Sequence, residues 1–294
     1  MNRKIKILIT GANGFIGSAI IKQLLFKKYK LLAITKKKQQ NTKNIQWVVS
    51  DLELNNLAID KISNFQPEII FHLAWEKIPD FSKKTCDINY KKNIFFLKKI
   101  LKIKSVKKII VSGSCFEYLL KKGKKKENNN IDTINNFPKT KNLILNFLKK
   151  NCNKNQKFAW FRIFYAYGPG QREGSLIPYL RKAINQNKEI EIKTPYVEND
   201  YIYIDDIARV FIRSININFN SGIFNLGSGI KIKTINIIKM IEKIKNKKFK
   251  IKQNNKDNKK SYSFYADMNK TKKKFNINNL TSFFNGLKKT LSMK

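Results

Sequence analysis

A glycine cluster near the start of the chain carries the clearest chemical signal in the sequence. The segment Thr10–Gly17, TGANGFIG, stands between an apolar run and an amphipathic, helix-like run. Glycines three residues apart let the backbone turn sharply and approach a pyrophosphate, and the helix start offers unpaired N–H groups and a positive dipole end. In this context the segment predicts a dinucleotide site rather than an ordinary turn.

The end of the second apolar run bears on which dinucleotide is bound. An acid at this place commonly binds the ribose hydroxyls of the adenosine. Here the segment 34–38 reads ITKKK, with three lysines and no carboxylate. Lysines favour a 2′-phosphate, so we expect NADP in preference to NAD. The alternative, that these lysines are part of a generally lysine-rich surface, stays open.

Apolar runs that alternate with helix-like runs predict the elements that position this site. The alternation is typical of a parallel sheet with crossover helices, so we expect an α/β, Rossmann-type doubly wound parallel sheet. Strands are expected at Ile5–Thr10, Tyr29–Thr35, Ile45–Asp51, Glu68–Trp75, Lys107–Ser114 and Lys157–Tyr167. Helices are expected at Phe15–Phe26, Leu54–Asn64, Ile88–Lys102 and Lys139–Lys150.

The rhythm changes after residues 168–170, GPG, where a smaller C-terminal lobe is expected to begin. We predict a Rossmann domain over residues 1–170, with 201–227 returning to pack on it, and a second lobe from 171–200 and 228–294. The later segments are expected to hold helices at Leu176–Asn185 and Thr234–Lys245, short strands near Ile190 and Tyr201, and a Lys/Asn-rich tail at 245–260. Residues 121–130 are expected to be an exposed loop.

The charge of the chain suggests nucleic acid or an anionic surface as a partner. The 294 residues include 61 Lys and Arg against 20 Asp and Glu, a formal net charge of +41. Only six of these are Arg, the better reader of phosphates and bases, and the lysines are spread along the chain without interleaved aromatic residues. We therefore expect a solvated basic surface and no nucleic-acid partner, with RNA or anionic-membrane binding as the alternative hypothesis.

The cysteines and the apolar runs bear on the compartment. Cys86, Cys115 and Cys152 are odd in number and follow no metal-ligand spacing, so neither a disulfide framework nor a metal site is expected. No apolar run approaches the roughly 20 residues that span a bilayer, and the first strand starts almost at once. We expect a cytoplasmic protein without a signal peptide or membrane association.

Several segments, in order, resemble the extended short-chain dehydrogenase/reductases, the NAD-dependent epimerase/dehydratase family. Beyond TGANGFIG these are 51–52 (DL), 71–74 (FHLA), 162–170 (RIFYAYGPG), 200–206 (DYIYIDD) and 224–227 (FNLG), so the resemblance covers roughly residues 5–245. The segments HLAW and GSCFEY are most similar to those of nucleotide 4-keto-6-deoxy-sugar reductases. The resemblance implies an NAD(P)-dependent enzyme of polysaccharide biosynthesis, with a nucleotide-sugar substrate held by the C-terminal lobe.

The resemblance also implies a cofactor site. Gly11, Gly14 and Gly17 would line the pyrophosphate, Asp51 would approach the adenine, and Ala74 would pass beside the cofactor. The full set implied is Gly11, Asn13, Gly14, Phe15, Ile16, Gly17, Thr35, Lys36, Asp51, Leu52, Ala74 and Lys141. His72, the one histidine, ends a strand, and we expect it to be structural rather than catalytic.

The catalytic set of this family is a Ser or Thr, a Tyr and a Lys. The lysine lowers the pKa of the phenol, the tyrosine moves a proton, and the hydroxyl residue steadies the sugar oxygen. By resemblance Ser114 and Lys141 match two of these, but Phe137 stands where the tyrosine is expected. The segment Tyr118–Lys122 also spells YxxxK, but Tyr118 is too close to Ser114 to face the nicotinamide from the next helix.

A second departure affects the substrate side. Many relatives have an arginine just before the aspartate that matches Asp200, and here that residue is Asn199. We therefore expect Arg172 or surface lysines to hold the substrate pyrophosphate, with Tyr165 also in the substrate site.

The resemblance leaves two functions open beside the RNA or membrane hypothesis. The first is an NAD(P)-dependent oxidoreductase or epimerase acting on a nucleotide-activated sugar, most specifically a 4-keto-6-deoxy-sugar reductase. The second is a nucleotide or nucleotide-sugar binding protein of the same fold that has lost its catalytic acid. Relatives commonly pair through the helices expected at 88–102 and 139–150, so a homodimer is also expected.

Overall fold

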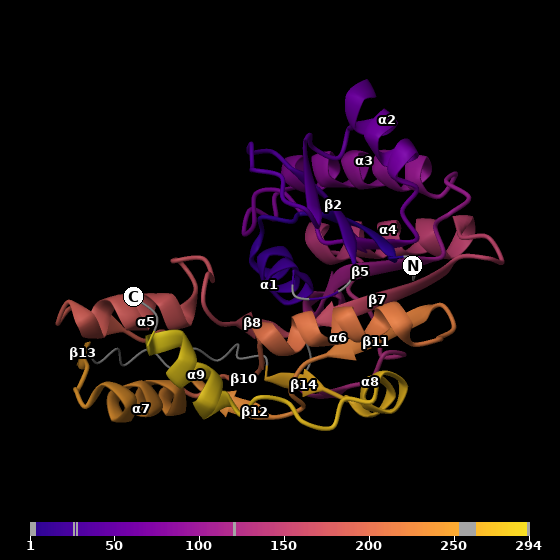
Figure 1. Cartoon of the computed structure of the whole chain (residues 1–294). Coiled ribbons are helices and arrows are strands. Elements are labelled where there is room, and N and C mark those ends of the chain that lie inside the picture. Colours follow the sequence, from indigo (N-terminus) through magenta and orange to yellow (C-terminus); the bar gives the residue numbers. More distant parts are fainter. Residues whose placement is uncertain (1–3, 26, 28, 120–121, 253–262, 293–294) are drawn as a thin grey trace. The chain divides into compact units, whose positions relative to one another are not determined.

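The computed structural model describes residues 4–25, 27, 29–119, 122–252 and 263–292 (Figure 1). The chain folds into two compact units. The first unit comprises Met1–Leu119, Asn130–Ile163 and Ala208–Phe224. The second unit comprises Leu120–Asn129, Phe164–Ile207 and Asn225–Lys294.

A seven-stranded sheet with the order β11-β7-β5-β4-β1-β2-β3 forms the centre of the first unit. Its strands are β1 (Lys6–Thr10), β2 (Lys30–Thr35), β3 (Ile45–Val49), β4 (Ile69–His72), β5 (Lys108–Ser114), β7 (Lys157–Ile163) and β11 (Gly222–Leu226). Neighbouring strands from β7 to β3 are parallel. The chain builds one half of the sheet outward from β1 and then starts the other half at β4, beside β1. This reversal is a topological switch point, and it confirms the predicted doubly wound α/β fold.

Helices cover both faces of this sheet, which explains why its strands are almost wholly apolar. On one face α2 (Asn56–Phe65), α3 (Lys83–Ile100) and α4 (Asn136–Asn151) enclose a core that includes Ile70 and Trp160. On the other face α6 (Ile204–Asn216) places Phe211 against Phe71 and Phe161. Figure 1 shows α1 (Phe15–Leu24) on the same side as α6.

Local capping explains where two of these helices begin. The side chain of Asn55 accepts a hydrogen bond from the N–H of Ala58 at the start of α2. Ser82 does the same for the N–H of Thr85 at the start of α3. Each cap satisfies an N–H group that the first helical turn leaves unpaired.

The predicted strand Lys157–Tyr167 is wrong as a single element, because it forms two strands. β7 ends at Ile163, and β8 (Tyr165–Tyr167) instead pairs with β10 (Glu198–Tyr203) in the second unit. Aromatic residues continue through the break, so the apolar pattern gives no sign that the chain changes sheets at Phe164.

The predicted loop 121–130 is also corrected. It contains β6 (Gly123–Lys125), which pairs in parallel with β14 (Phe264–Ala266). A three-residue strand with two lysines has no apolar alternation, so the pattern rules cannot detect it.

The second unit is built around β10. This strand pairs with β12 (Lys231–Lys233), β14 and β8, and a separate two-stranded sheet joins β9 (Glu189–Glu191) to β13 (Lys250–Lys252). Its helices α5 (Leu176–Asn185) and α7 (Thr234–Lys245) have the predicted bounds. The sequence analysis missed α8 (Asn269–Phe275), α9 (Phe283–Ser292) and β14, and part of the predicted tail, 253–262, lies outside the described residues. Within the described residues, no helix combines the length and the apolar character needed to cross a membrane.

Candidate functional site

The glycine turn joins β1 to α1 in the first unit. Gly11 has φ +67°, and a Cβ there would lie 2.8 Å from the backbone nitrogen of Ala74. A Cβ on Gly17 would overlap the backbone oxygen of Gly11. Gly14 is the N-cap of α1. It has no side chain that could accept a hydrogen bond from the first N–H groups of the helix. Close backbone packing thus requires two of these glycines, and the third leaves the helix start accessible to an anion.

A cavity of about 430 Å³ opens at this turn. Its walls come from the turn and from the segments that follow β2, β3 and β4. It therefore lies at the carboxyl ends of parallel strands beside the switch point, where doubly wound sheets bind their ligands. It brings together eight residues of the predicted cofactor set, namely Gly11, Asn13, Gly14, Thr35, Lys36, Asp51, Leu52 and Ala74. Phe15, Ile16 and Gly17 lie in the first turn of α1, and Lys141 lies on α4.

Hydrogen bonds hold the turn against the end of β2. The Nδ2 of Asn13 donates to the Oγ1 of Thr35 over 2.7 Å. The same oxygen accepts the N–H of Lys37 over 3.1 Å. The two sides of the cavity are therefore linked through one hydroxyl group.

Two lysines pair with carboxylates that line the cavity. The Nζ of Lys36 lies 2.6 Å from the Oε1 of Glu76. The Nζ of Lys92, on α3, lies 2.6 Å from the Oδ2 of Asp51 and 3.2 Å from the Oε1 of Glu76. The hydrogen bond that Lys92 donates to Asp51 raises the pKa of Lys92 to about 12. Burial alone would raise the pKa of Asp51, but Lys92 and the N–H of Glu53 hold it below its usual value.

His72 has a structural role at the end of β4. The Oγ1 of Thr10 accepts hydrogen bonds from the N–H groups of Leu73 and Ala74. The hydroxyl group therefore donates its own hydrogen bond to the Nδ1 of His72, 2.8 Å away. The Nε2 of His72 then donates to the Oδ1 of Asn93, also over 2.8 Å. Burial lowers the pKa of His72 to about 3, which keeps the ring neutral. The histidine therefore links Thr10, at the end of β1, to Asn93 on α3.

Phe137 and Lys141 lie one turn apart on α4, and both are buried. The Nζ of Lys141 is 5.9 Å from the centroid of the Phe137 ring and 4.2 Å from that of Trp75. It donates to the backbone oxygen of Ser112 over 2.9 Å, and it makes no ion pair with any carboxylate among the described residues. Burial lowers the pKa of Lys141 to about 8. The ammonium group can therefore lose its proton near neutral pH.

Aromatic rings surround Phe137. The ring centroids of Trp75 and Phe81 lie 5.1 and 4.5 Å from that of Phe137. The indole N–H of Trp75 is buried and has no hydrogen-bond partner within the described part of the chain. Phe137 thus fills an apolar place beside Lys141 and offers no group that could donate or accept a proton.

Glu117, which the sequence analysis missed, positions Ser114. Its carboxylate accepts the Nε1–H of Trp160 over 2.9 Å and the Nε–H of Arg162 over 2.9 Å. It also accepts the N–H of Ser114 over 2.8 Å, and the Oγ of Ser114 accepts the N–H of Phe116 over 3.2 Å. This reciprocal pattern is a capping box, so the spacing Ser-x-x-Glu was the signal available in the sequence.

The YxxxK alternative is excluded as a site by the surroundings of its tyrosine. Tyr118 is fully buried, and the Arg162 guanidinium lies 4.4 Å from the centroid of its ring. Its ring packs in the core together with the Glu117–Arg162 pair, whose atoms are 2.9 Å apart. A group enclosed in this way cannot reach a ligand.

The predicted substrate residues belong to the second unit. Tyr165 lies on β8, with its ring 5.6 Å from that of Tyr201. Arg172 is exposed in the loop before α5. The Oδ1 of Asn199, on β10, is buried and lacks a hydrogen-bond partner among the residues that the structure describes. Those residues also contain no group of three His, Cys, Asp or Glu side chains arranged for a metal ion.

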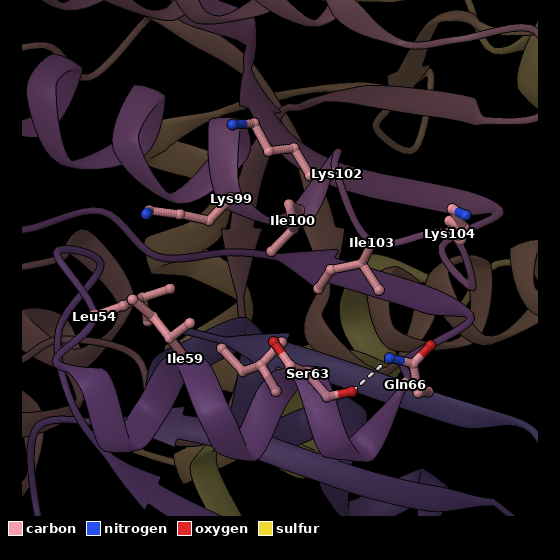
Figure 2. Close-up of a pocket in the computed structure, with 10 residues that line it drawn as sticks. Leu54, Ile59, Ser63, Gln66, Lys99, Ile100, Lys102, Ile103 and Lys104 are labelled. Atoms are coloured by element: carbon pink, nitrogen blue, oxygen red, sulfur yellow. Dashed lines mark hydrogen bonds between the residues drawn. The ribbon is translucent and has the colours of Figure 1, made fainter.

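Figure 2 shows a second cavity of about 430 Å³, also in the first unit. Its lining comes from α2, including Ser63, from Gln66 directly after this helix, and from the end of α3 and the loop up to Lys104. These segments lead into β4 and β5, so the cavity lies at the amino ends of the strands. Because ligands of doubly wound sheets bind at the carboxyl ends, we do not assign the dinucleotide to it.

Known proteins resemble this chain over most of its length. It is 25% identical to CDP-abequose synthase from Salmonella muenchen, over 81% of this chain and 80% of that protein. It is 28% identical to dTDP-4-dehydro-6-deoxyglucose reductase from Escherichia coli, over 84% of each chain. A solved structure of UDP-glucuronic acid 4-epimerase from Bacillus cereus, in complex with UDP-glucuronic acid and NAD, matches with a TM-score of 0.85 at 22% identity over 98% of each chain.

A family model also matches the chain. The model describes the NAD dependent epimerase/dehydratase family, and residues 7–227 match it. This range holds the glycine turn, the cavity residues and the Ser114, Phe137 and Lys141 set, and it is more than half of the chain. The chain belongs to the NAD dependent epimerase/dehydratase family.

Proposed function

We propose that this chain is an NAD(P)-dependent oxidoreductase that acts on a nucleotide-activated sugar and reduces a 4-keto-6-deoxy sugar. The observation that carries the proposal is the glycine turn, whose uncapped helix start opens on a cavity at the switch point of the sheet. Backbone N–H groups there would hold the pyrophosphate of the dinucleotide. Asp51 and Leu52 would lie beside the adenine.

The sugar class is proposed from the relatives. Those named CDP-abequose synthase and dTDP-4-dehydro-6-deoxyglucose reductase each match over four fifths or more of this chain. We propose that the second unit is the substrate-binding lobe, with Tyr165 and Arg172 holding the nucleotide sugar. An arginine suits this role because its guanidinium binds phosphate oxygens in a bidentate manner.

In the proposed reaction the cofactor is the source of the hydride, and residues of this chain bind the sugar oxygen and supply the proton. The reduced nicotinamide, when bound, would supply the hydride for the carbonyl carbon. Ser114 stabilises the carbonyl oxygen of the sugar. Lys141 binds the nicotinamide ribose and provides a proton. Phe137 keeps the ring that packs beside Lys141 but gives no proton. The lysine can act as the acid because burial lowers its pKa to about 8.

Phe137 also favours a second candidate, a nucleotide or nucleotide-sugar binding protein without catalysis. Removing a positioned acid or base typically lowers a rate about 10²- to 10⁴-fold, while binding is retained. In that case the cavity would still take the dinucleotide, but the sugar would not be turned over.

One experiment tests both candidates. The oxidation of NADH and NADPH is measured with CDP-, dTDP- and UDP-linked 4-keto-6-deoxy sugars, for the natural chain and for Phe137→Tyr. Turnover by the natural chain supports the reductase, whereas turnover by Phe137→Tyr alone supports the binding protein. If dinucleotide binds in calorimetry and neither protein turns over any of these sugars, the reductase is wrong and the binding protein is supported. If no dinucleotide binds at millimolar concentration, both are wrong.

A further inference from the structure

Three carboxylates gather where the adenosine end of a dinucleotide would meet the protein. Asp51 follows β3, Glu53 comes two residues later, and Glu76 lies four residues after the end of β4. Asp51 and Glu76 both line the cavity. The whole chain has only 20 acidic residues against 61 basic ones, so three acids in one cluster depart from its general composition.

These acids form ion pairs with Lys36, one of the three lysines at the end of β2, and with Lys92 on α3. Glu76 binds Lys36 over 2.6 Å, and Lys92 binds Asp51 over 2.6 Å and Glu53 over 3.7 Å. This cluster contains two ammonium groups and three carboxylates, so the cluster itself carries no excess of positive charge, while Lys37 and Lys77 also line the cavity. Lys36 is therefore not a free cation.

The two partners of the Lys36–Glu76 pair differ in how firmly they are held. The Lys36 side chain is 58% exposed, whereas that of Glu76 is 17% exposed. The backbone N–H of Glu76 donates to the Oδ1 of Asn89 over 2.8 Å, and the Nδ2 of Asn89 donates back to the Glu76 oxygen over 3.3 Å. These contacts with Asn89 hold the Glu76 backbone, so the carboxylate of Glu76 is the more firmly held partner at the cavity wall.

A carboxylate in this place distinguishes the two dinucleotides. The 2′-hydroxyl of NAD can donate a hydrogen bond to a carboxylate, whereas the 2′-phosphate of NADP brings about two further negative charges towards Glu76 and Asp51. We infer that Glu76 is a specificity-determining residue that selects NAD(H) over NADP(H). It supplies, from the segment after β4, the acid that the end of β2 lacks.

This inference rests on the proposed function, because it concerns the dinucleotide in the same cavity. It replaces the preference for NADP that the three lysines suggested in the sequence. That preference assumed that Lys36 was available to a phosphate, and its 2.6 Å contact with Glu76 removes this assumption.

Binding measurements on the full chain test the inference. The Kd values of NAD⁺ and NADP⁺ are measured by calorimetry for the natural protein and for Glu76→Gln, which keeps the shape of the side chain and removes its charge. We expect the natural protein to bind NAD⁺ about tenfold or more tightly than NADP⁺, and Glu76→Gln to shift this ratio towards NADP⁺ by about tenfold.

One matched variant serves as a control. Glu53→Gln removes a carboxylate that also contacts Lys92 but is 63% exposed and does not line the cavity, so the ratio should change less than about threefold. Thermal unfolding followed by circular dichroism checks that each variant is folded.

The outcomes separate the inference from the function on which it rests. A natural protein that prefers NADP⁺ overturns the inference, and so does a folded Glu76→Gln protein that binds NAD⁺ with an unchanged ratio. Under either result the proposed dinucleotide site stands. If the folded natural protein binds neither dinucleotide, the proposed function and the inference both fall.

Discussion

The ammonium group of Lys141 lies 4.2 Å from the centroid of the Trp75 ring and donates to the backbone oxygen of Ser112, 2.9 Å away. A cation held between an aromatic face and one carbonyl is stabilised by both contacts, but burial removes its hydration. The lowering of the pKa of Lys141 to about 8 shows that the loss of hydration dominates. The charge is therefore kept in this place at the expense of stability.

Replacing this lysine should stabilise the fold. Below pH 8 the folded lysine is charged and buried, and the destabilisation is present in full. As the pH rises from 8 to 10.5 the folded form loses its proton before the unfolded form, and the destabilisation disappears. Lys141→Met should raise the free energy of unfolding by about 3 kcal/mol at pH 7 and by less than about 1 kcal/mol at pH 10.5. Urea unfolding at both pH values measures this, and a Lys141→Met protein less stable than the natural chain at pH 7 contradicts it.

The pH dependence of sugar reduction should report the same group. If Lys141 provides the proton, reduction by the natural protein should fall as the pH rises through about 8. In Phe137→Tyr a phenol takes over proton transfer, and kcat should rise about 100-fold or more. Phe81→Tyr is the matched control, because Phe81 packs 4.5 Å from the Phe137 ring, and it should leave kcat unchanged within about threefold. A rate independent of pH between 7 and 9 in the natural protein would exclude Lys141 as the donor.

His72 should make the fold sensitive to acid. Above pH 6.5 the ring is neutral in both the folded and the unfolded chain. Below pH 6.5 the unfolded chain binds a proton that the folded chain does not bind until about pH 3, so stability falls as the pH falls. This group should remove about 2 kcal/mol between pH 8 and pH 5. His72→Gln should lose that share of the pH dependence, and equal slopes for the two proteins in chemical unfolding would show that His72 does not cause it.

The glycines of the turn should separate folding from binding. A Cβ on Gly17 meets backbone atoms of Gly11 and Ala12, so Gly17→Ala should lower the free energy of unfolding by about 2 kcal/mol or more. A Cβ on Gly14 has only the Gly11 oxygen nearby, at 3.1 Å, and the φ of Gly14 is −74°. Gly14→Ala should therefore stay close to natural stability while it weakens dinucleotide binding about tenfold. Thermal unfolding and calorimetry on both variants decide this, and the assignment of the cavity is wrong if Gly14→Ala binds as tightly as the natural protein.

The sequence predicts those parts of the fold that depend on local pattern. The turn after β1 and the bounds of α5 and α7 follow from glycine spacing and helical periodicity. The exchange of sheets at Phe164 does not follow, because the pairing of β8 with β10 joins residues far apart in the chain. Short strands such as β6 and β14 are not predicted either, because they too pair with residues far away in the chain.

Much of the candidate site could be located in the sequence, but its electrostatics could not. The residues around the glycine turn gather in one cavity as the family pattern implies. The pairing of Lys36 with Glu76 joins residues 40 positions apart, and that of Lys92 with Asp51 joins residues 41 positions apart. No spacing rule detects such pairs, so the sequence gives no sign that Lys36 is paired with a carboxylate.

The division of the second unit into Leu120–Asn129, Phe164–Ile207 and Asn225–Lys294 limits how this protein can be re-engineered. If the C-terminal portion were exchanged with that of a relative, β6 and β8 of this chain would have to pair with strands of the relative. A chimera intended to carry a new sugar preference would have to replace all three stretches together. A chain cut after Ile163 would lose β11. Strand β7 would then be an exposed edge strand that could pair with other molecules.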